Sequence, residues 1–565
     1  MKLKSSIINS MIRKVRNHFS SLNLFISLLL FCPLLVSCVT EDMGECPDDI
    51  PGSKIPVPEY YITINVINDT GSHTRAFTDN DKPGNSSSGE LEGTSEETRI
   101  EDITLFLCVN NKVKHSFSAE YIDPLNGSNS TSARIRIPNI NDLSDLAGED
   151  VQFFLAANTS TFGFNLSENP EADETDDVAE AVFNMTSFST PIGDFGNDGK
   201  GKLMPLVSSE MVTINVPADL SASPDELIAA IKAMFVRDSG TIKWWDVLNE
   251  DEEPIHLERA VARIEYRDID RTSDASLPKE KHVYKIESSP AVNLKLSSMQ
   301  MYNVSSKSYM FKHTSAGDYN KAVEDLDLLQ VEKGSIEDKY NWVATPDWDF
   351  SGSEPSKSTG NFLNSIDFNS GFAVDASNSG TYNSYITIED LEKRSTSSET
   401  GFRPWCYVSE NTIPSIELMQ SFDSNGDHLV AKYATGVLFT FTILGQDGKT
   451  PLIYNENENG YPAGVTNSPN KPYAIEIVDK QGKWIEVERT GTNYYIKYMA
   501  CILHNKIMNG DKYAPMYYGV VRNNTYQMYV NSISKLPDPN EPKSLYLNLS
   551  VNIKEWQQRE NGYDF

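Results

Sequence analysis

The chain has 565 residues, of which 80 are acidic and 49 are Lys or Arg, so its formal net charge is −31. A chain this acidic lacks the basic surface that nucleic-acid phosphates require, which excludes nucleic acid as a partner. With 26 Tyr, 24 Phe and many alternating segments separated by polar residues, Gly and Pro, the composition predicts a mainly β protein. We expect two domains, or three, in a chain of this length.

Residues 1–37 are typical of a secretory signal peptide. Five basic residues and no acidic one occur in this segment, and its apolar run from Leu22 to Val36 is too short for a membrane-spanning helix. Leu35-Val36-Ser37-Cys38 fits the cleavage site of a bacterial lipoprotein. We therefore expect Cys38 to carry lipid and to attach the protein to the outer membrane. The alternative is an ordinary signal peptide followed by an incidental cysteine.

A short strand is expected next, within a lipidated N-terminal segment at 38–75. Its apolar face consists of four alternating residues, which are Tyr60, Ile62, Ile64 and Val66. From Asn68 to Thr98 nearly every residue is polar or Gly, which predicts an exposed loop that protease can cut. Within it, Arg75 followed by Ala76 is an accessible site for a trypsin-like protease. Taken alone, Arg75 is simply a solvated residue.

Alternating and continuous apolar segments predict two sheet domains, at 76–256 and 257–565. The first domain has candidate strands at 103–109, 151–157 and 212–216, and the second has them at 259–266, 292–296, 436–443, 473–478 and 494–502. Ser223-Pro224-Asp225-Glu226 combines an N-cap, a proline at the first helical position and a capping-box glutamate, which predicts a short structural helix. Residues 314–400 are read as long loops, in which strands cannot be placed.

The C-terminus combines a proline-rich connector with one more alternating strand. Three prolines between Pro537 and Pro542 favour an extended, stiff segment. The strand expected at 544–553 has five residues on its apolar face, which are Leu545, Leu547, Leu549, Val551 and Ile553. From the pattern alone, such a strand is most simply the last strand of its own sheet. It is also a candidate donor strand for a neighbouring subunit.

Taken together, these residues resemble the fimbrillin pilins, lipoprotein subunits of type V pili, and are most similar to the minor-fimbrium shaft subunits. The resemblance rests on the lipoprotein site, the strand before Arg75-Ala76, the stretches Glu258–Arg263 and Val521–Tyr526, and the closing strand with Trp556. It implies two tandem transthyretin-like β-sandwich domains with a few short helices. It also implies cleavage at Arg75 by an arginine-specific protease, and strand exchange between subunits at the cell surface. The implied partners are copies of the same chain, other fimbrial subunits, and the outer membrane through the lipid.

One departure from the shaft pattern concerns the position of a cysteine. Cys46-Pro47 lies eight residues after the lipid site in an acidic context, and this is more similar to anchor subunits, which keep their lipid at the fibre base. An anchor or tip role in the same family is therefore the alternative to a shaft role.

Strand exchange has a physical rationale in the two apolar faces. Withdrawing the first strand would expose a groove that held about four inward side chains, each contributing roughly 1.5 to 3 kcal/mol of burial, or about 6 to 12 kcal/mol as an upper bound. The vacated groove would also present unpaired backbone groups that accept another strand. Because donor and acceptor are different surfaces of identical subunits, the contact is head-to-tail and produces a filament.

Searches for catalytic or metal-binding patterns point to no enzyme and no cofactor. The eight histidines show no metal-ligand spacing. Residues 423–427 lack the downstream glutamate of a calcium loop and are interpreted as a turn, and residues 196–201 are interpreted as a loop. Cys46, Cys108, Cys406 and Cys501 could pair in three ways, although Cys108 and Cys501 lie in apolar, strand-like surroundings.

Two other classes of protein stay open. A glycan-binding surface lipoprotein would need exposed indoles as stacking platforms, and the candidates are Trp244, Trp245, Trp348 and Trp405. A secreted hydrolase would need a pair of carboxylates in a cleft, and no pair is singled out among the 80 acidic residues.

Overall fold

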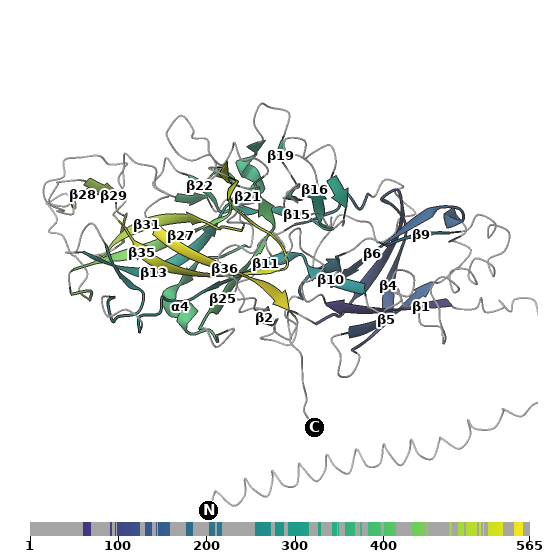
Figure 1. Cartoon of the computed structure of the whole chain (residues 1–565), viewed down its shortest axis with the longest axis horizontal. Helices are drawn as coiled ribbons and strands as arrows, with labels where there is room; N and C mark the ends of the chain where they lie inside the picture. The colour runs from purple at the N-terminus through teal and green to yellow at the C-terminus, as the bar shows by residue number, and fades with distance from the viewer. Residues whose placement is uncertain are drawn as a thin grey trace, which may run out of the picture. The chain divides into compact units, whose positions relative to one another are not determined.

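The structure is a computed structural model of the whole chain (Figure 1). It describes residues 60–68, 91–92, 97, 99–124, 130–137, 143, 145–158, 177–184, 203–209, 212–216, 255–272, 277–286, 292–315, 326–328, 342–346, 348–349, 356–367, 373–375, 382–396, 401–413, 432–445, 447–449, 474–476, 484–486, 488–490, 493–504, 508–509, 512–513, 518–534 and 547–557. These residues are mainly β-strand, which confirms the predicted fold class.

An eight-stranded sheet contains the first strand of the chain. Its order is β3-β4-β5-β1-β10-β8-β6-β9, and β6 pairs with β3 as well, so the hydrogen-bonded order returns to its start. The strands are β1 (Tyr60–Asn68), β3 (Ile103–Val109), β4 (Lys112–Pro124), β5 (Ser130–Ile137), β6 (Asp150–Ala157), β8 (Leu206–Ser208), β9 (Val212–Asn215) and β10 (Ile255–Arg259). The strands expected near 103, 151 and 212 are all present.

β3 and β6 are buried on both faces, as the apolar run at 151–157 predicted. Leu105 and Leu155 lie in the main hydrophobic core. Phe106 and Phe154 point to the opposite side of the sheet, where Phe311 covers them and a second cluster forms. Because successive side chains of a strand face opposite sides, only a sheet covered on both faces can bury a continuous apolar run.

Two further sheets contain most of the C-terminal half. The five-stranded sheet has the order β2-β36-β35-β11-β25, and the six-stranded sheet has the order β12-β13-β27-β31-β30 with β24 paired to β13. Their strands are β2 (Leu91–Glu92), β36 (Leu547–Gln557), β35 (Asn524–Ile533), β11 (Val261–Tyr266), β25 (Arg403–Ser409), β12 (Val283–Lys285), β13 (Asn293–Tyr302), β27 (Gly436–Leu444), β31 (Asn493–Cys501), β30 (Glu488–Thr490) and β24 (Ile386–Thr387).

The inner faces of these two sheets share one core. Tyr266 of β11 packs on Phe439 of β27, with ring centroids 6.2 Å apart, and both side chains are fully buried. Tyr526 of β35 belongs to the same cluster. The pairing of two inner faces is that of a sandwich. The transthyretin-like arrangement of tandem domains stays a prediction.

Further short strands accompany these sheets, and several of them lie within residues 314–400, which are interpreted from the sequence as long loops. They are β7 (Val182–Asn184), β14 (Val304–Ser305), β15 (Lys307–Tyr309), β16 (His313–Ser315), β17 (Leu326–Leu328), β18 (Trp342–Ala344), β19 (Trp348–Asp349), β20 (Ser356–Lys357), β21 (Phe362–Leu363), β22 (Ser365–Asp367), β23 (Ala373–Asp375), β26 (Asn411–Thr412), β28 (Ala474–Glu476), β29 (Trp484–Glu486), β32 (Met508–Asn509), β33 (Lys512–Tyr513) and β34 (Gly519–Val520). A short helix, α4 (Ile388–Glu392), and a 3-10 turn, η10 (Thr359–Asn361), accompany them. The helix expected after Ser223 lies outside the described residues.

The chain passes directly from one sheet to another at Ala260. β10 ends at Arg259 within the eight-stranded sheet, and β11 begins at Val261 within the five-stranded sheet. The strand expected at 259–266 is therefore two strands divided by a single residue. The expected domain boundary between residues 256 and 257 falls inside β10.

Candidate functional site

The first strand is held along both edges within the eight-stranded sheet (Figure 1). β1 pairs antiparallel with β5 from Tyr60↔Ile137 to Ile67↔Ser130, and its end pairs in parallel with β10 at Val66↔Ile255. Val66 is fully buried in the core. Tyr60, Ile62 and Ile64 occupy alternate positions of the same strand, as predicted. Withdrawal of β1 would leave β5 and β10 without their shared partner.

The last strand is a member of its own five-stranded sheet. β36 pairs antiparallel with β35 from Asn524↔Glu555 to Ile533↔Leu547, with a register shift between Val530 and Ser532. Three of its predicted apolar residues lie opposite fully buried core residues of β35, in the pairs Leu549↔Val530, Val551↔Met528 and Ile553↔Tyr526. The strand runs to Gln557, four residues beyond the predicted end.

The other positions singled out from the sequence fall outside the described residues. These are the lipidation residue Cys38, the cleavage residues Arg75 and Ala76, Leu545 at the start of the candidate donor strand, and Cys46 with the proline-rich connector. Their roles stay predictions.

The expectation of a fully exposed loop from Asn68 to Thr98 is wrong at its C-terminal end. Leu91 and Glu92 form β2, which pairs in parallel with Trp556 and Gln557 of β36. The Glu97 side chain is buried and accepts a hydrogen bond from Arg263 Nη1, 2.7 Å from Glu97 Oε2. The physical reason is that a buried guanidinium requires a compensating carboxylate, which the nearby loop supplies.

Four buried charged side chains meet beside the point where the chain changes sheets. Lys312 Nζ donates to Glu258 Oε2 at 2.9 Å, and Arg522 Nη2 donates to Glu410 Oε2 at 3.0 Å. All four are at most 1% exposed, and the two pairs are linked by an Arg522 Nη1 to Glu258 Oε1 distance of 3.9 Å. Burial raises the pKa of Glu258, and Lys312 and Arg522 act in the opposite direction.

Two of the stretches on which the sequence resemblance rests, Glu258–Arg263 and Val521–Tyr526, are hydrogen-bonded to each other at this junction. Arg259 Nη1 donates to Asn523 Oδ1 at 3.3 Å, and the Asn523 backbone N–H donates to the Val261 carbonyl at 3.0 Å. Asn523 has a φ of 55°, a left-handed conformation that Asn tolerates better than most residues. β11 then pairs in parallel with β35, beginning at Arg263↔Thr525. The stretches Glu258–Arg263 and Val521–Tyr526 thus form one structural unit.

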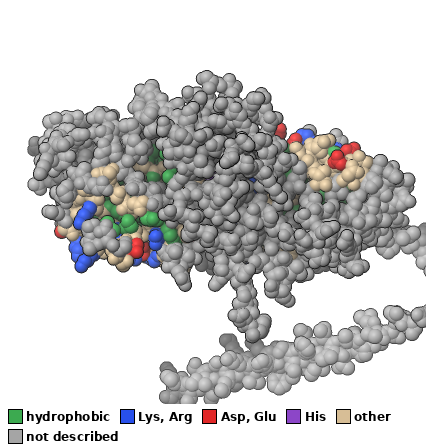
Figure 2. All heavy atoms as spheres, in the orientation of Figure 1, with side chains coloured by type: hydrophobic (Ala, Val, Ile, Leu, Met, Phe, Trp, Pro, Cys, Tyr) green, Lys and Arg blue, Asp and Glu red, His purple; other side chains and the backbone are tan. Residues whose placement is uncertain are grey.

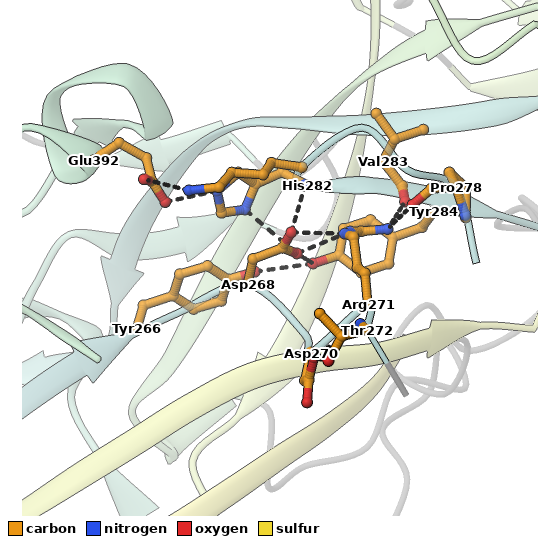
Figure 3. A network of polar contacts seen from close by, with 11 residues as sticks. Tyr266, Asp268, Asp270, Arg271, Thr272, Pro278, His282, Val283, Tyr284 and Glu392 are labelled. Carbon is orange, nitrogen blue, oxygen red and sulfur yellow. Dashed lines mark hydrogen bonds and ion pairs between the residues drawn. The ribbon is translucent and has the colours of Figure 1, made fainter. Parts of the chain in front are cut away.

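A second polar network lies around Asp268 and joins the turn after β11 to α4 (Figure 3). Arg271 forms a bidentate pair with Asp268, and the Tyr284 hydroxyl donates to the same carboxylate at 3.1 Å. Burial acts to raise the pKa of Asp268, but the hydrogen bonds from Arg271 and the charge of His282 outweigh it, so the pKa is lowered.

His282 completes this network by contacting Asp268 and Glu392. Its Nε2 lies 3.0 Å from Glu392 Oε1, and burial lowers its pKa despite the nearby Asp268 and Glu392. The Arg271 guanidinium donates to the Asp268 carboxylate and to the backbone carbonyls of Pro278 and Val283, as Figure 3 shows. We interpret the network as a structural clamp between elements. On the described surface around α4, acidic and basic side chains are interspersed (Figure 2), as in the pair Lys393–Asp390.

The structure also bears on the cysteines, the indoles and possible metal or membrane sites. Cys108 and Cys406 are buried free thiols, and Cys501 is a partly buried free thiol. Trp405 is 1% exposed, which removes it from the glycan-binding alternative, and Trp348 packs on Tyr433.

Within the described ranges, no group of three His, Cys, Asp or Glu side chains is placed to hold a metal ion. No helix in the same ranges is long and apolar enough to cross a membrane.

Comparison with known families found a match at the C-terminal end of the chain. Residues 489–562, which include β31, β35 and β36, match the family "Major fimbrial subunit protein type IV, Fimbrillin, C-terminal". This part of the chain is therefore similar to the fimbrillins. No curated protein matches the chain.

Solved structures similar to this chain include a fimbrilin and a tip fimbrial protein. The fimbrilin from Porphyromonas gingivalis is 12% identical, with a TM-score of 0.36 over 88% of this chain and 98% of that chain. The tip fimbrial protein Mfa3 from the same organism is 10% identical, with a TM-score of 0.30 over 88% and 100% of the two chains. A candidate cell adhesion protein from Parabacteroides distasonis is 12% identical, with a TM-score of 0.37 over 88% and 99%.

Proposed function

We propose that this chain is a fimbrillin, a structural subunit of a surface fimbria that supports adhesion, rather than an enzyme. In this proposal it is exported as a lipoprotein through Cys38, cleaved after Arg75 by an arginine-specific protease, and polymerised by donor-strand exchange. The observation that carries the proposal is the family match, because it includes all of β36, the strand that we assign as the donor. Its partners are then copies of itself, other fimbrial subunits and the outer membrane.

The two terminal strands are suited to an exchange because each lies at one end of the chain. Either strand can leave its sheet without breaking the chain between the other strands. β1 is joined to the rest of the chain through the segment that contains Arg75, so cleavage there leaves only hydrogen bonds and side-chain packing to retain it. β36 is the last described strand and is preceded by the proline-rich connector. In sequence order, β1 is the first strand of its sheet and β36 is the last strand of its sheet.

The free-energy balance of the exchange compares two sites for the donor strand, its place beside β35 and the β1 groove of a neighbouring subunit. A donor that fills the β1 groove recovers about 6 to 12 kcal/mol of apolar burial as an upper bound. The same strand must first leave β35, where it lies opposite Val530, Met528 and Tyr526. The exchange is downhill only when the β1 groove is empty, and proteolysis after Arg75 is the step that allows β1 to leave it.

The test is electron microscopy of the purified mature protein before and after treatment with an arginine-specific protease. We expect fibres from the treated wild type and none from Arg75→Ala, which should remain a folded monomer. Arg99→Ala is the matched control, because Arg99 is a partly exposed arginine downstream of the same loop, paired with Glu101. Fibres of normal length from Arg75→Ala would refute cleavage at this position.

A further inference from the structure

The segment downstream of the proposed cleavage site contacts the five-stranded sheet at two points. Leu91 and Glu92 pair with the end of β36, and Glu97 reaches β11 and β25. Both contacts lie after Arg75 in the sequence, so cleavage there would not remove them. The new N-terminal arm of the cleaved subunit would still be attached to the sheet that holds β36.

Glu97 occupies a two-donor socket built by adjacent strands. Arg263 of β11 and Tyr407 of β25 are direct partners in the antiparallel register. Arg263 Nη1 donates to Glu97 Oε2 at 2.7 Å, and the Tyr407 hydroxyl donates to Glu97 Oε1. The Arg263 and Glu97 side chains are 1% and 2% exposed. Charge-assisted hydrogen bonds from two donors to one buried carboxylate are among the stronger polar contacts in proteins.

The tether between the two contacts is short. Four residues separate Glu92 from Glu97, and such a segment reaches about 17 Å when fully extended. β2 and β11 are three strand spacings apart in the sheet order β2-β36-β35-β11, which is about 14 Å. Glu97 in its socket therefore keeps β2 on a four-residue connection to the sheet that contains β36.

We propose that β2 (Leu91–Glu92) and Glu97 together form a latch that retains β36 in its own subunit after cleavage at Arg75. Glu97 in the Arg263–Tyr407 socket is the anchor, and β2 is the contact that covers the outer edge of β36. This inference rests on the proposed function, in which β36 is the donor strand. It adds a controlling contact: the donor leaves only after β2 separates from Trp556 and Gln557.

The first test measures hydrogen–deuterium exchange in the purified full-length mature protein, without any polymerisation. Glu97→Gln keeps the side-chain shape but removes the charge, and residues 547–557 should exchange about ten- to a hundredfold faster, as expected when a buried charge-assisted bond is lost. Glu101→Gln is the matched control, because Glu101 is 56% exposed and pairs with the partly exposed Arg99. The latch is refuted if exchange at 547–557 is unchanged, or if β13 and β27 accelerate equally.

A second variant covers the case in which Glu97→Gln fails to fold. Leu91→Cys with Trp556→Cys joins two register partners of β2 and β36. In the oxidised, protease-treated protein we expect fibre growth to stop and to resume on addition of reductant. Equal growth in both states would overturn the latch.

The same experiments separate the latch from the proposed function. If Glu97→Gln loosens residues 547–557 but neither this variant nor the wild type forms fibres after cleavage, then the latch contact stands and β36 is not the donor. If fibres form and Glu97→Gln neither loosens β36 nor accelerates growth, then the proposed function stands and the latch is wrong.

Discussion

The buried charge cluster at the junction gives the sharpest test of the structure. Replacing Lys312 by Met keeps most of the side-chain volume but removes the one charge that, among the described residues, lies within hydrogen-bond distance of Glu258. Arg522 cannot take over that role without moving, because its Nη1 lies 3.9 Å from Glu258 Oε1 and its Nη2 is bonded to Glu410. Removing one partner of a fully buried ion pair costs about 3 to 5 kcal/mol, which is the loss of unfolding free energy that we expect.

A compensating variant separates the charge from the packing. Lys312→Met combined with Glu258→Leu removes both charges and leaves the Arg522–Glu410 pair balanced. We expect the double variant to recover about half or more of the loss, with a coupling energy of about 2 kcal/mol. Lys449→Met is the control for loss of a lysine, because the Lys449–Glu280 pair is exposed, and it should change stability little.

The pH dependence of the single variant gives an independent check. Burial already raises the pKa of Glu258, and loss of Lys312 raises it further. A carboxyl group with a raised folded-state pKa favours the folded state below its unfolded pKa and loses that contribution as the pH rises. The defect of Lys312→Met should therefore be larger at pH 8 than at pH 5.

The assay is equilibrium urea unfolding, followed by tryptophan fluorescence and far-UV circular dichroism. The reasoning fails if Lys312→Met loses less than about 1 kcal/mol. It also fails if the double variant is less stable than the two single variants predict by addition, because the pair would then contribute no favourable coupling.

Two further predictions follow from the same structure. Burial lowers the pKa of His313 to about 4, so the neutral imidazole stabilises the fold above pH 6.5 and this contribution, about 3 kcal/mol, is lost as the pH falls toward 4. The stability difference between wild type and His313→Asn should shrink by that amount between pH 7 and pH 4 in urea titrations, and a constant difference would contradict it. Deleting residues 544–565 should stop fibre growth after a single addition and should lower the melting temperature, because Tyr526, Met528 and Val530 lose their cross-strand partners. Fibres of wild-type length in electron micrographs of the deletion variant would rule out β36 as the donor.

Sequence patterns predicted the strands wherever apolar residues occupied one or both faces of a strand. The alternation at 60–66 and 545–553, and the continuous run at 151–157, each follow from burial of one or both faces of a strand. Such patterns are local, because they need only the residues of the strand itself. The same patterns could not say which strands are neighbours, and only the structure shows that β36 is paired within its own sheet.

The polar contacts at the junction carried no comparable local signal. Glu97 lies 166 residues from Arg263, and Glu410 lies 112 residues from Arg522. In a chain with 80 acidic residues, a buried carboxylate is indistinguishable in sequence from an exposed one. The stretch around Glu97 was read as loop because its composition is polar, and its role depends entirely on a guanidinium that the fold buries elsewhere.

Residues 255–266 give the subunit a mechanical property through their direct passage between sheets. β10 is bonded in parallel to β1, and β11, one residue later, is bonded in parallel to β35. In the filament that we propose, a pull applied to a donor strand in the β1 position would reach the sheet of β36 through β10 and β11, along peptide bonds. Such a subunit would transmit tension along the filament without its two halves being drawn apart.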